Sequence, residues 1–220
     1  MGTLEKLASS YERTPVIRGL IQLIPFGIGS GIDVALVTTI QNIRADRVKT
    51  FFDQLEANDA VLNPELLKSE DFLHCYFATV NAALNTKRRE KIRMFAKLLS
   101  SAVSTSLFNN SDEYEEYLSI LDELTFRELV ILNILHRHED ATPLIQNEND
   151  LQRANRFWEK FIEEIETELR IPRNEINSLL TRLNRTGCYE TFTGSYLSYT
   201  GGRGKLTPLY FRLESLVDRV

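Results

Sequence analysis

The chain has 220 residues, of which 43% are hydrophobic and 26% charged, so it can bury one large core or two small ones and is not expected to be disordered. Its net charge of -5 argues against a general nucleic-acid coat. The charge is unevenly spread, because residues 169–220 carry 8 basic and 4 acidic side chains, a local net charge of +4.

Residues 3–12 predict a short first helix, and Pro15 suits the first position of a second one. That second helix opens the most apolar stretch of the chain, residues 16–43 (VIRGLIQLIPFGIGSGIDVALVTTIQNI). Arg18 and Asp33 bracket only fourteen uncharged residues, whereas a membrane-spanning helix needs about 20 apolar ones. Pro25 and the glycines that follow it predict a tight reversal, so the stretch is interpreted as an apolar helical hairpin.

Two interpretations of this hairpin stay open. It can form part of a helical-bundle core, or it can be sheltered in one state and presented to a membrane or a partner in another. The candidate contact residues are Leu20, Ile24, Phe26, Ile28, Ile32 and Leu36.

Helical periodicity continues through the first half of the chain. After the reversal, apolar residues from Ile32 to Leu55, with Ile40 and Ile43 among them, predict one stripe of a helix that ends near Asn58. Asn63-Pro64 predicts a further helix start, and Thr86 is a candidate cap for the helix after that.

The helix expected after Thr86 begins with an unusual concentration of positive charge, which the helix dipole disfavours. The basic residues are Lys87, Arg88, Arg89, Lys91 and Arg93. The nearest acidic partners in sequence are residues 112–116. Anionic lipid and nucleic acid are the alternative partners for this charge.

The polar residues 109–112 mark the predicted domain boundary, with a helical bundle over 1–109 and a second domain over 110–220. Thr125 and Glu128 form a T-x-x-E capping box at the start of a helix. Residues 139–150 predict a polar loop, followed by an amphipathic helix around Phe157 and Phe161 with an acidic face.

The last fifty residues predict a helix opened by Pro172 and stopped at Gly187, two short strands at 188–193 and 205–207, and a final helix from Pro208. Helix, helix, helix, hairpin, helix is the order of a winged-helix domain. The expected fold is therefore mainly α, with an N-terminal helical bundle and a C-terminal winged-helix-like domain that holds a small β-hairpin.

In a winged helix the third helix can enter a major groove. Its outward face and the wing supply polar and basic side chains that suit phosphates and base edges. The candidate DNA-contact residues are Arg173, Asn174, Asn177, Ser178, Thr181, Arg182, Arg185, Arg203 and Lys205.

No catalytic, cofactor-binding or metal site is predicted. The glycines at 27, 29 and 31 lack the preceding strand and the spacing of a dinucleotide loop, and residues 201–204 lack the Lys-Ser/Thr ending of a phosphate loop. His136 and His138 lie two apart on a predicted helix and so point in different directions. The two cysteines and the short, charged residues 1–13 predict reduced thiols in a cytoplasmic protein, with contact to a membrane surface as an alternative.

The layout of residues 87–220 resembles the bacterial abortive-infection alpha (Abi-alpha) proteins. The resemblance is carried by FAKLLSSA in the basic helix, by EEYLSILDELTFRELVILNIL, and by the C-terminal LTPLYFRLESLV. It implies a bacterial cytoplasmic protein connected with phage defence and supplies no catalytic residues.

Three functional hypotheses follow. The favoured one is a non-enzymatic helical interaction protein that oligomerises or contacts a membrane or partner protein through the apolar hairpin. The alternatives are a winged-helix DNA-binding regulator and an enzyme with an unrecognised site. No small-molecule substrate is inferred.

Overall fold

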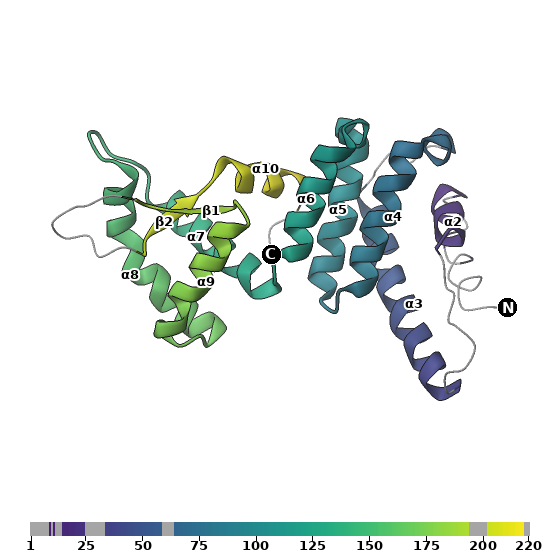
Figure 1. Ribbon diagram of the computed structural model, residues 1–220, viewed down its shortest axis with the longest axis horizontal. Coiled ribbons are helices and arrows are strands. Elements are labelled where there is room, and N and C mark those ends of the chain that lie inside the picture. Colours follow the sequence, from purple (N-terminus) through teal and green to yellow (C-terminus); the bar gives the residue numbers. More distant parts are fainter. Residues whose placement is uncertain are drawn as a thin grey trace. The chain divides into compact units, whose positions relative to one another are not determined.

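The computed structural model describes residues 9, 11, 15–24, 34–58, 64–193 and 202–217, with the backbone alone at 15 and 34–38. The chain forms two compact units, Met1–Leu121 and Asp122–Val220. The described residues are mainly helical and contain one two-stranded antiparallel sheet (Figure 1), which confirms the predicted fold class at this level. The predicted boundary at 109/110 lies earlier than the division between the units, because most of α6 packs in the N-terminal unit.

The N-terminal unit is built from helices that pack along one another (Figure 1). They are α2 (Pro15–Gln22), α3 (Val34–Ala57), η1 (Pro64–Lys68), α4 (Glu70–Asn85), α5 (Arg89–Thr105), η2 (Leu107–Asn109) and α6 (Ser111–Glu123). Tyr114 of α6 is fully buried and shares a hydrogen bond with Thr79 of α4, which places α6 in this unit. Burial raises the pKa of the Tyr114 phenol, so this group stays protonated and can donate that bond.

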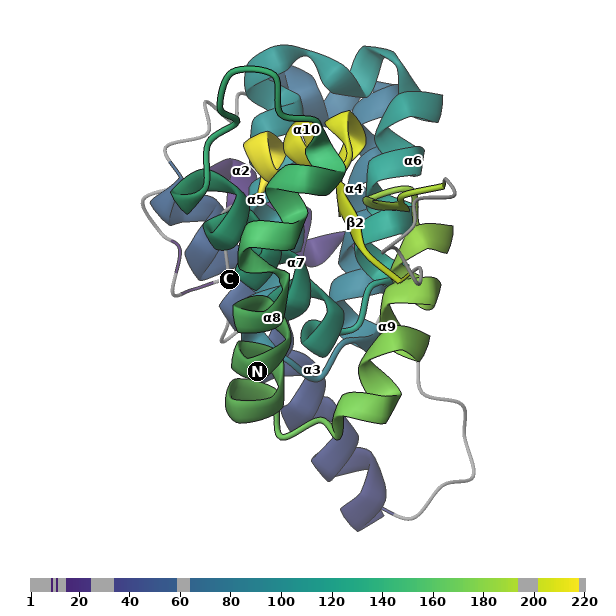
Figure 2. The ribbon, with the colours of Figure 1, turned by 90° about the vertical axis from the view of Figure 1, so that its left-hand side faces the viewer.

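The core stripe predicted for α3 holds in the helix's C-terminal half, whereas the two stripe residues described in the other half, Ile40 and Ile43, are not buried. Val48, Phe51, Phe52 and Leu55 are all buried, whereas Ile43 is 46% exposed. Ile40 is intermediate in burial. Figures 1 and 2 show the reason, because the N-terminal half of α3 extends past the ends of α4 and α5.

Two predicted helix starts in this unit were wrong in detail. Pro64 opens the short 3-10 helix η1, and α4 is capped instead by Ser69, whose hydroxyl accepts from the Phe72 N–H at 3.3 Å. Thr86 ends α4, because its N–H donates to the Ala83 carbonyl, and α5 begins after Arg88 without a side-chain cap.

The C-terminal unit contains α7 (Phe126–Ala141), α8 (Asp150–Leu169), α9 (Arg173–Arg185), β1 (Tyr189–Thr191), β2 (Gly204–Leu206) and α10 (Pro208–Leu216). The strands pair with Tyr189 opposite Leu206 and Thr191 opposite Gly204. The predicted capping box of Thr125 and Glu128 is present at the start of α7. Gly187 adopts a φ of 76° just after α9, which confirms the predicted stop.

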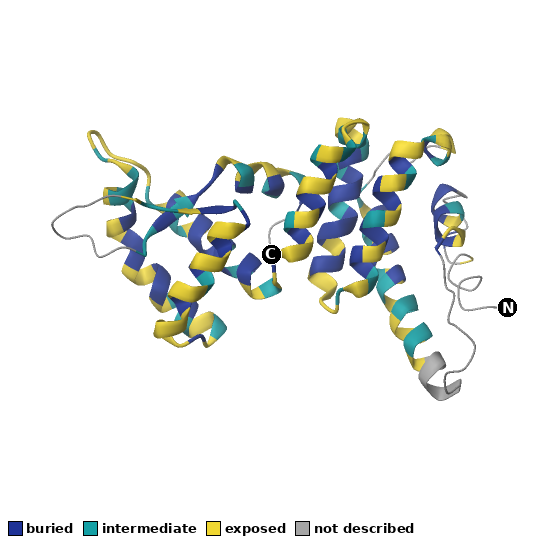
Figure 3. Cartoon of the chain, in the orientation of Figure 1, coloured by how far each residue is buried: buried dark blue, intermediate teal, exposed yellow. Residues whose placement is uncertain are grey.

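Burial in both units follows the helical period, as Figure 3 shows by its alternating colours. In the C-terminal unit the inward residues Phe157, Phe161 and Ile165 of α8 face the core, as predicted. Among the described helices, none combines the length and apolar character that crossing a bilayer requires.

Candidate interaction surfaces

The outward face of α9 is open to solvent. Ile176, Leu180 and Leu183 are buried and anchor the opposite face of this helix to the core. The predicted DNA-contact residues of α9 are all exposed; they are Arg173, Asn174, Asn177, Ser178, Thr181, Arg182 and Arg185. The structure therefore brings these side chains together along one polar helix face.

Two of the three arginines on that face are already paired. Arg173 bonds to Glu159 and lies 3.5 Å from Glu166, both on α8, and the hydrogen bond to Glu159 raises the pKa of the Arg173 guanidinium. Arg182 Nε lies 3.0 Å from Oε1 of Glu128, which is 1% exposed. Arg185 makes no ion pair or hydrogen bond to another described side chain. Sequence reasoning missed Glu128 as a partner, because its capping role already explained it.

The two basic residues of the predicted wing, Arg203 and Lys205, are also held by neighbours. Lys205 Nζ lies 2.7 Å from Asp150 and 3.1 Å from Glu190, and these two hydrogen bonds raise the pKa of the ammonium group. Arg203 donates to the side-chain oxygen of Asn155. Much of the positive charge counted for DNA binding is thus balanced within the unit, which weakens the attraction for phosphate.

The first arm of the apolar hairpin contributes to the core through both of its candidate contact residues. Leu20 is 0% and Ile24 4% exposed, and the buried Tyr76 hydroxyl donates to the Leu20 carbonyl at 2.6 Å. The remaining candidate contact residues Phe26, Ile28 and Ile32, and the side chain of Leu36, lie outside the described residues. The first arm of the hairpin therefore belongs to the core of the N-terminal unit.

A groove of about 580 Å³ lies where the N-terminal half of α3 meets the junction between α4 and α5. Its lining combines two isoleucines with polar and charged side chains: Asn42, Ile43, Asp46, Arg47, Lys87, Arg89 and Ile92. Arg47 donates to the carbonyl of Leu84, and Arg89 pairs with Asp46 at 2.7 Å. Lys87 and Arg93 are exposed. Arg47, Lys87 and Arg89 line the groove, and Arg44, Arg88 and Arg93 lie within four residues of them in sequence. We call these six basic residues the basic end.

Charge compensation at the basic end differs from the prediction. The sequence pointed to residues 112–116, but Asp46 of α3 is the partner of Arg89, while Glu115 bonds to His74. Lys91 is buried, with its ammonium 5.6 Å from the centre of the Phe95 ring. Asp46 and Arg89 are 43 residues apart, so local sequence patterns could not predict that they pair.

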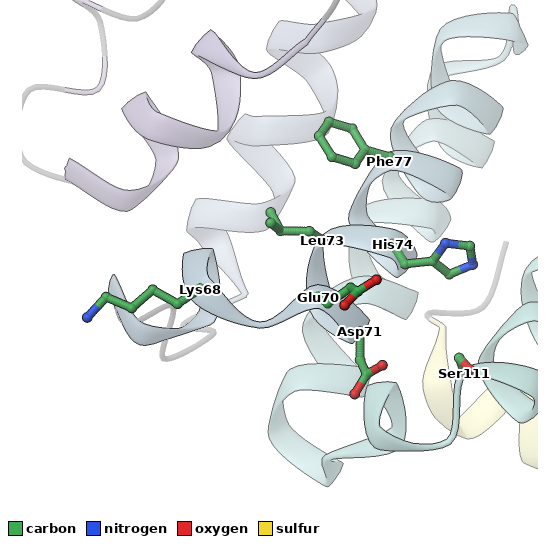
Figure 4. A pocket seen from close by; sticks show the side chains of 7 residues that line it. All are labelled: Lys68, Glu70, Asp71, Leu73, His74, Phe77 and Ser111. Carbon is green, nitrogen blue, oxygen red and sulfur yellow. The ribbon is translucent and has the colours of Figure 1, made fainter.

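A second groove, of about 570 Å³, runs along α4. It is lined by Lys68, Glu70, Asp71, Leu73, His74, Phe77 and Ser111. Figure 4 shows that Lys68 points away from the two carboxylates, in keeping with its ion pair to Glu65 at 2.9 Å. His74 of this groove is bonded to Glu115. The groove thus presents carboxylates and one aromatic edge, without a convergent set of donors.

The histidines of α7 are paired with glutamates, and both cysteines are buried. His136 Nδ1 lies 2.7 Å from Glu214 of α10, and His138 Nε2 lies 2.6 Å from Glu164 of α8, so the two rings point apart as predicted. Burial raises the pKa of both thiols, Cys75 and Cys188, to about 11. In the part of the chain that the structure describes, no group of three or more His, Cys, Asp or Glu side chains could hold a metal ion.

Comparison with models of known protein families, with curated proteins and with solved structures gave no match for the chain. The resemblance of residues 87–220 to the abortive-infection alpha proteins stays a prediction.

Proposed function

We propose that the chain is a non-enzymatic, cytoplasmic helical interaction protein of the bacterial abortive-infection alpha type, connected with phage defence. In this proposal it works by contact, with a second copy, a partner protein or a membrane surface. The contact is made by the second arm of the apolar hairpin, at the basic end of the N-terminal unit.

The observation that carries the proposal is the exposure of Ile43 beside the basic end. Ile43 is 46% exposed in the N-terminal half of α3, and it lines a groove together with the basic residues Arg47, Lys87 and Arg89. An exposed aliphatic side chain among cations gives a contact surface both an apolar anchor and a charge preference. The first arm of the hairpin, in contrast, is committed to the core.

The buried thiols take no part in the proposed contact. Burial raises the pKa of both to about 11, which disfavours the reactive thiolate form at neutral pH. The buried Glu139 accepts a hydrogen bond from the Leu206 N–H at 3.0 Å and lies 3.3 Å from Arg153, a structural role that joins α7 to β2.

Site-specific photo-cross-linking in living cells tests the proposal. A benzophenone amino acid placed at position 43 should give an adduct with a protein, a second copy or a lipid, and the same group at Ile145 is the control. Ile145 is 60% exposed on the C-terminal unit, so it matches position 43 in access to solvent. The proposal requires that the adduct weaken when Lys87 and Arg93 are both changed to glutamine. Equal cross-linking from positions 43 and 145 would overturn it.

A second candidate is a winged-helix DNA-binding regulator. The order of elements in the C-terminal unit and the open polar face of α9 favour it. The ion pairs of Arg173, Arg182 and Lys205 count against it, because each reduces the charge available to phosphate.

A further inference from the structure

The basic end has the chemistry of a surface that lies on an anionic bilayer. Three of its basic side chains line the groove and the other three lie within four residues of them in sequence, in a chain whose net charge is -5; Asp46 and Glu90 are the acidic residues within that same sequence distance. Lys87, Arg88, Arg89 and Arg93 are all exposed at the start of α5. Clusters of four to eight Lys and Arg on an amphipathic helix are typical of segments that bind anionic phospholipids.

The apolar part of the surface favours lipid over a nucleic-acid backbone. Ile43 projects among the cations at 46% exposure, and Ile40 on the preceding turn of α3 is half-buried. A phosphate backbone offers nothing for exposed isoleucines to contact, whereas the boundary between headgroups and acyl chains accepts both kinds of side chain. The groove lined by Ile43 and Lys87 has a volume of about 580 Å³, which is large enough for a phospholipid headgroup.

One ion pair limits the positive charge that this surface presents. The Arg89 side chain is bonded to Asp46 at 2.7 Å, and both side chains are more than half exposed. An exposed pair of this kind contributes little to stability, so Arg89 can exchange its carboxylate partner for a lipid phosphate. Asp46 therefore works against anion binding at the basic end.

We propose that the basic end docks the N-terminal unit on an anionic phospholipid surface. Lys87, Arg89 and Arg93 contact lipid phosphates, and Ile43 enters the boundary between headgroups and acyl chains. This inference rests on the proposed function, because it names the partner of the same surface.

The test is flotation of the purified full chain with vesicles of phosphatidylcholine alone, and with vesicles in which about a third of the lipid is phosphatidylglycerol. Binding should be confined to the anionic vesicles and should weaken as salt is raised, because salt screens exposed charges. Each basic side chain near the surface contributes about fivefold in affinity. The double variant Lys87→Gln and Arg93→Gln should therefore bind about twenty-fivefold more weakly.

Two further variants sharpen the test. Asp46→Asn should bind anionic vesicles about fivefold more tightly, since it removes one negative charge and releases Arg89. Ile43→Ser should weaken binding, whereas Ile145→Ser, an exposed position of the other unit, should leave it unchanged. Lys160→Gln combined with Arg212→Gln removes two exposed charges elsewhere and serves as the control for the double variant.

Outcomes separate this inference from the proposed function. Equal binding to both kinds of vesicle, or binding unaffected by the Lys87 and Arg93 changes, overturns docking on anionic lipid. A protein adduct from position 43 together with no vesicle binding also overturns it, and assigns the surface to an acidic protein while the proposed function stands. If the chain shows neither binding to vesicles nor a position-specific adduct, the lipid inference and the proposed function are both overturned.

Discussion

Arg182 of α9 lies 3.0 Å from the buried carboxylate of Glu128, which also closes the capping box at the start of α7. The Oε2 atom of Glu128 accepts from the Thr125 N–H at 2.8 Å and from the Thr125 hydroxyl at 2.7 Å, and Oε1 faces Arg182. Glu128 is 1% exposed, so these neighbours compensate for the water that its side chain loses on burial. A residue selected from the sequence as a DNA contact thus joins two helices of the C-terminal unit.

The change Arg182→Ala should destabilise the C-terminal unit by about 1 to 3 kcal/mol, because it leaves a buried carboxylate oxygen without its cation. Arg185→Ala is the matched control and should stay within about 0.5 kcal/mol of the wild type. Trp158, the chain's single tryptophan, is buried in this unit, so its fluorescence during urea unfolding reports the difference. Equal stabilities of the two variants would show that the Arg182–Glu128 pair contributes nothing.

Glu139 should make the stability of the C-terminal unit depend on pH. Burial raises the pKa of this carboxyl above its ordinary value of 4.5, so the folded state holds the proton to higher pH than the unfolded chain does. Its favourable contribution is complete below pH 4.5 and is lost as the pH rises through the folded pKa. The free energy of unfolding of the wild type, relative to that of Glu139→Gln, should therefore fall as the pH rises from 4.5 through the folded pKa. Unfolding followed by Trp158 fluorescence at several pH values measures this difference. A difference that rises with pH would contradict a raised pKa for Glu139.

The core role of the first hairpin arm can be tested by comparing two leucines of one segment. Leu20 is 0% exposed and Leu23 is 44% exposed. Leu20→Ala should lower the free energy of unfolding of the N-terminal unit by about 2 to 5 kcal/mol, because it removes buried methyl groups and leaves a cavity. Leu23→Ala should have a much smaller effect. Thermal unfolding followed by circular dichroism distinguishes them, and comparable losses would place Leu20 outside the core.

For the DNA-binding alternative, the α9 arginines should contribute unequally. Arg185→Ala should reduce the salt slope of duplex binding by about 1 if Arg185 contacts a phosphate. Arg173→Ala should leave the slope nearly unchanged, because Glu159 and Glu166 already balance that charge. A gel shift across salt concentrations measures both variants. A wild-type chain without any salt-dependent shift would remove the alternative.

Local patterns in the sequence were enough to predict the helical fold and its small hairpin. The Thr125–Glu128 capping box, the stop at Gly187 and the inward face of α9 each depend on residues within one or two turns, so composition and spacing disclose them. Strand bounds differed by only a residue or two, since the pairing register sets where hydrogen bonds begin.

Interactions between distant segments could not be predicted in the same way. Ile43 fits the apolar stripe of α3, yet its 46% exposure depends on how far α4 and α5 extend along that helix. The partners Asp46 and Glu128 likewise depend on how helices pack, because ion pairs of this kind join residues 43 and 54 positions apart. The exposed polar face of α9 could be predicted from the sequence, whereas the ion pairs of Arg173 and Arg182 with glutamates of other helices could not.

Each of the two units contains one buried thiol, whose rate of chemical labelling can report on that unit alone. Cys75 lies in one unit and Cys188 in the other, and both are free and 0% exposed. A thiol reagent can reach either sulfur only when the surrounding structure opens, so the labelling rate reports the opening free energy of that unit. Mass spectrometry of the two cysteine peptides would then follow the halves separately in one sample. Contact at the basic end should slow the labelling of Cys75 and leave that of Cys188 unchanged.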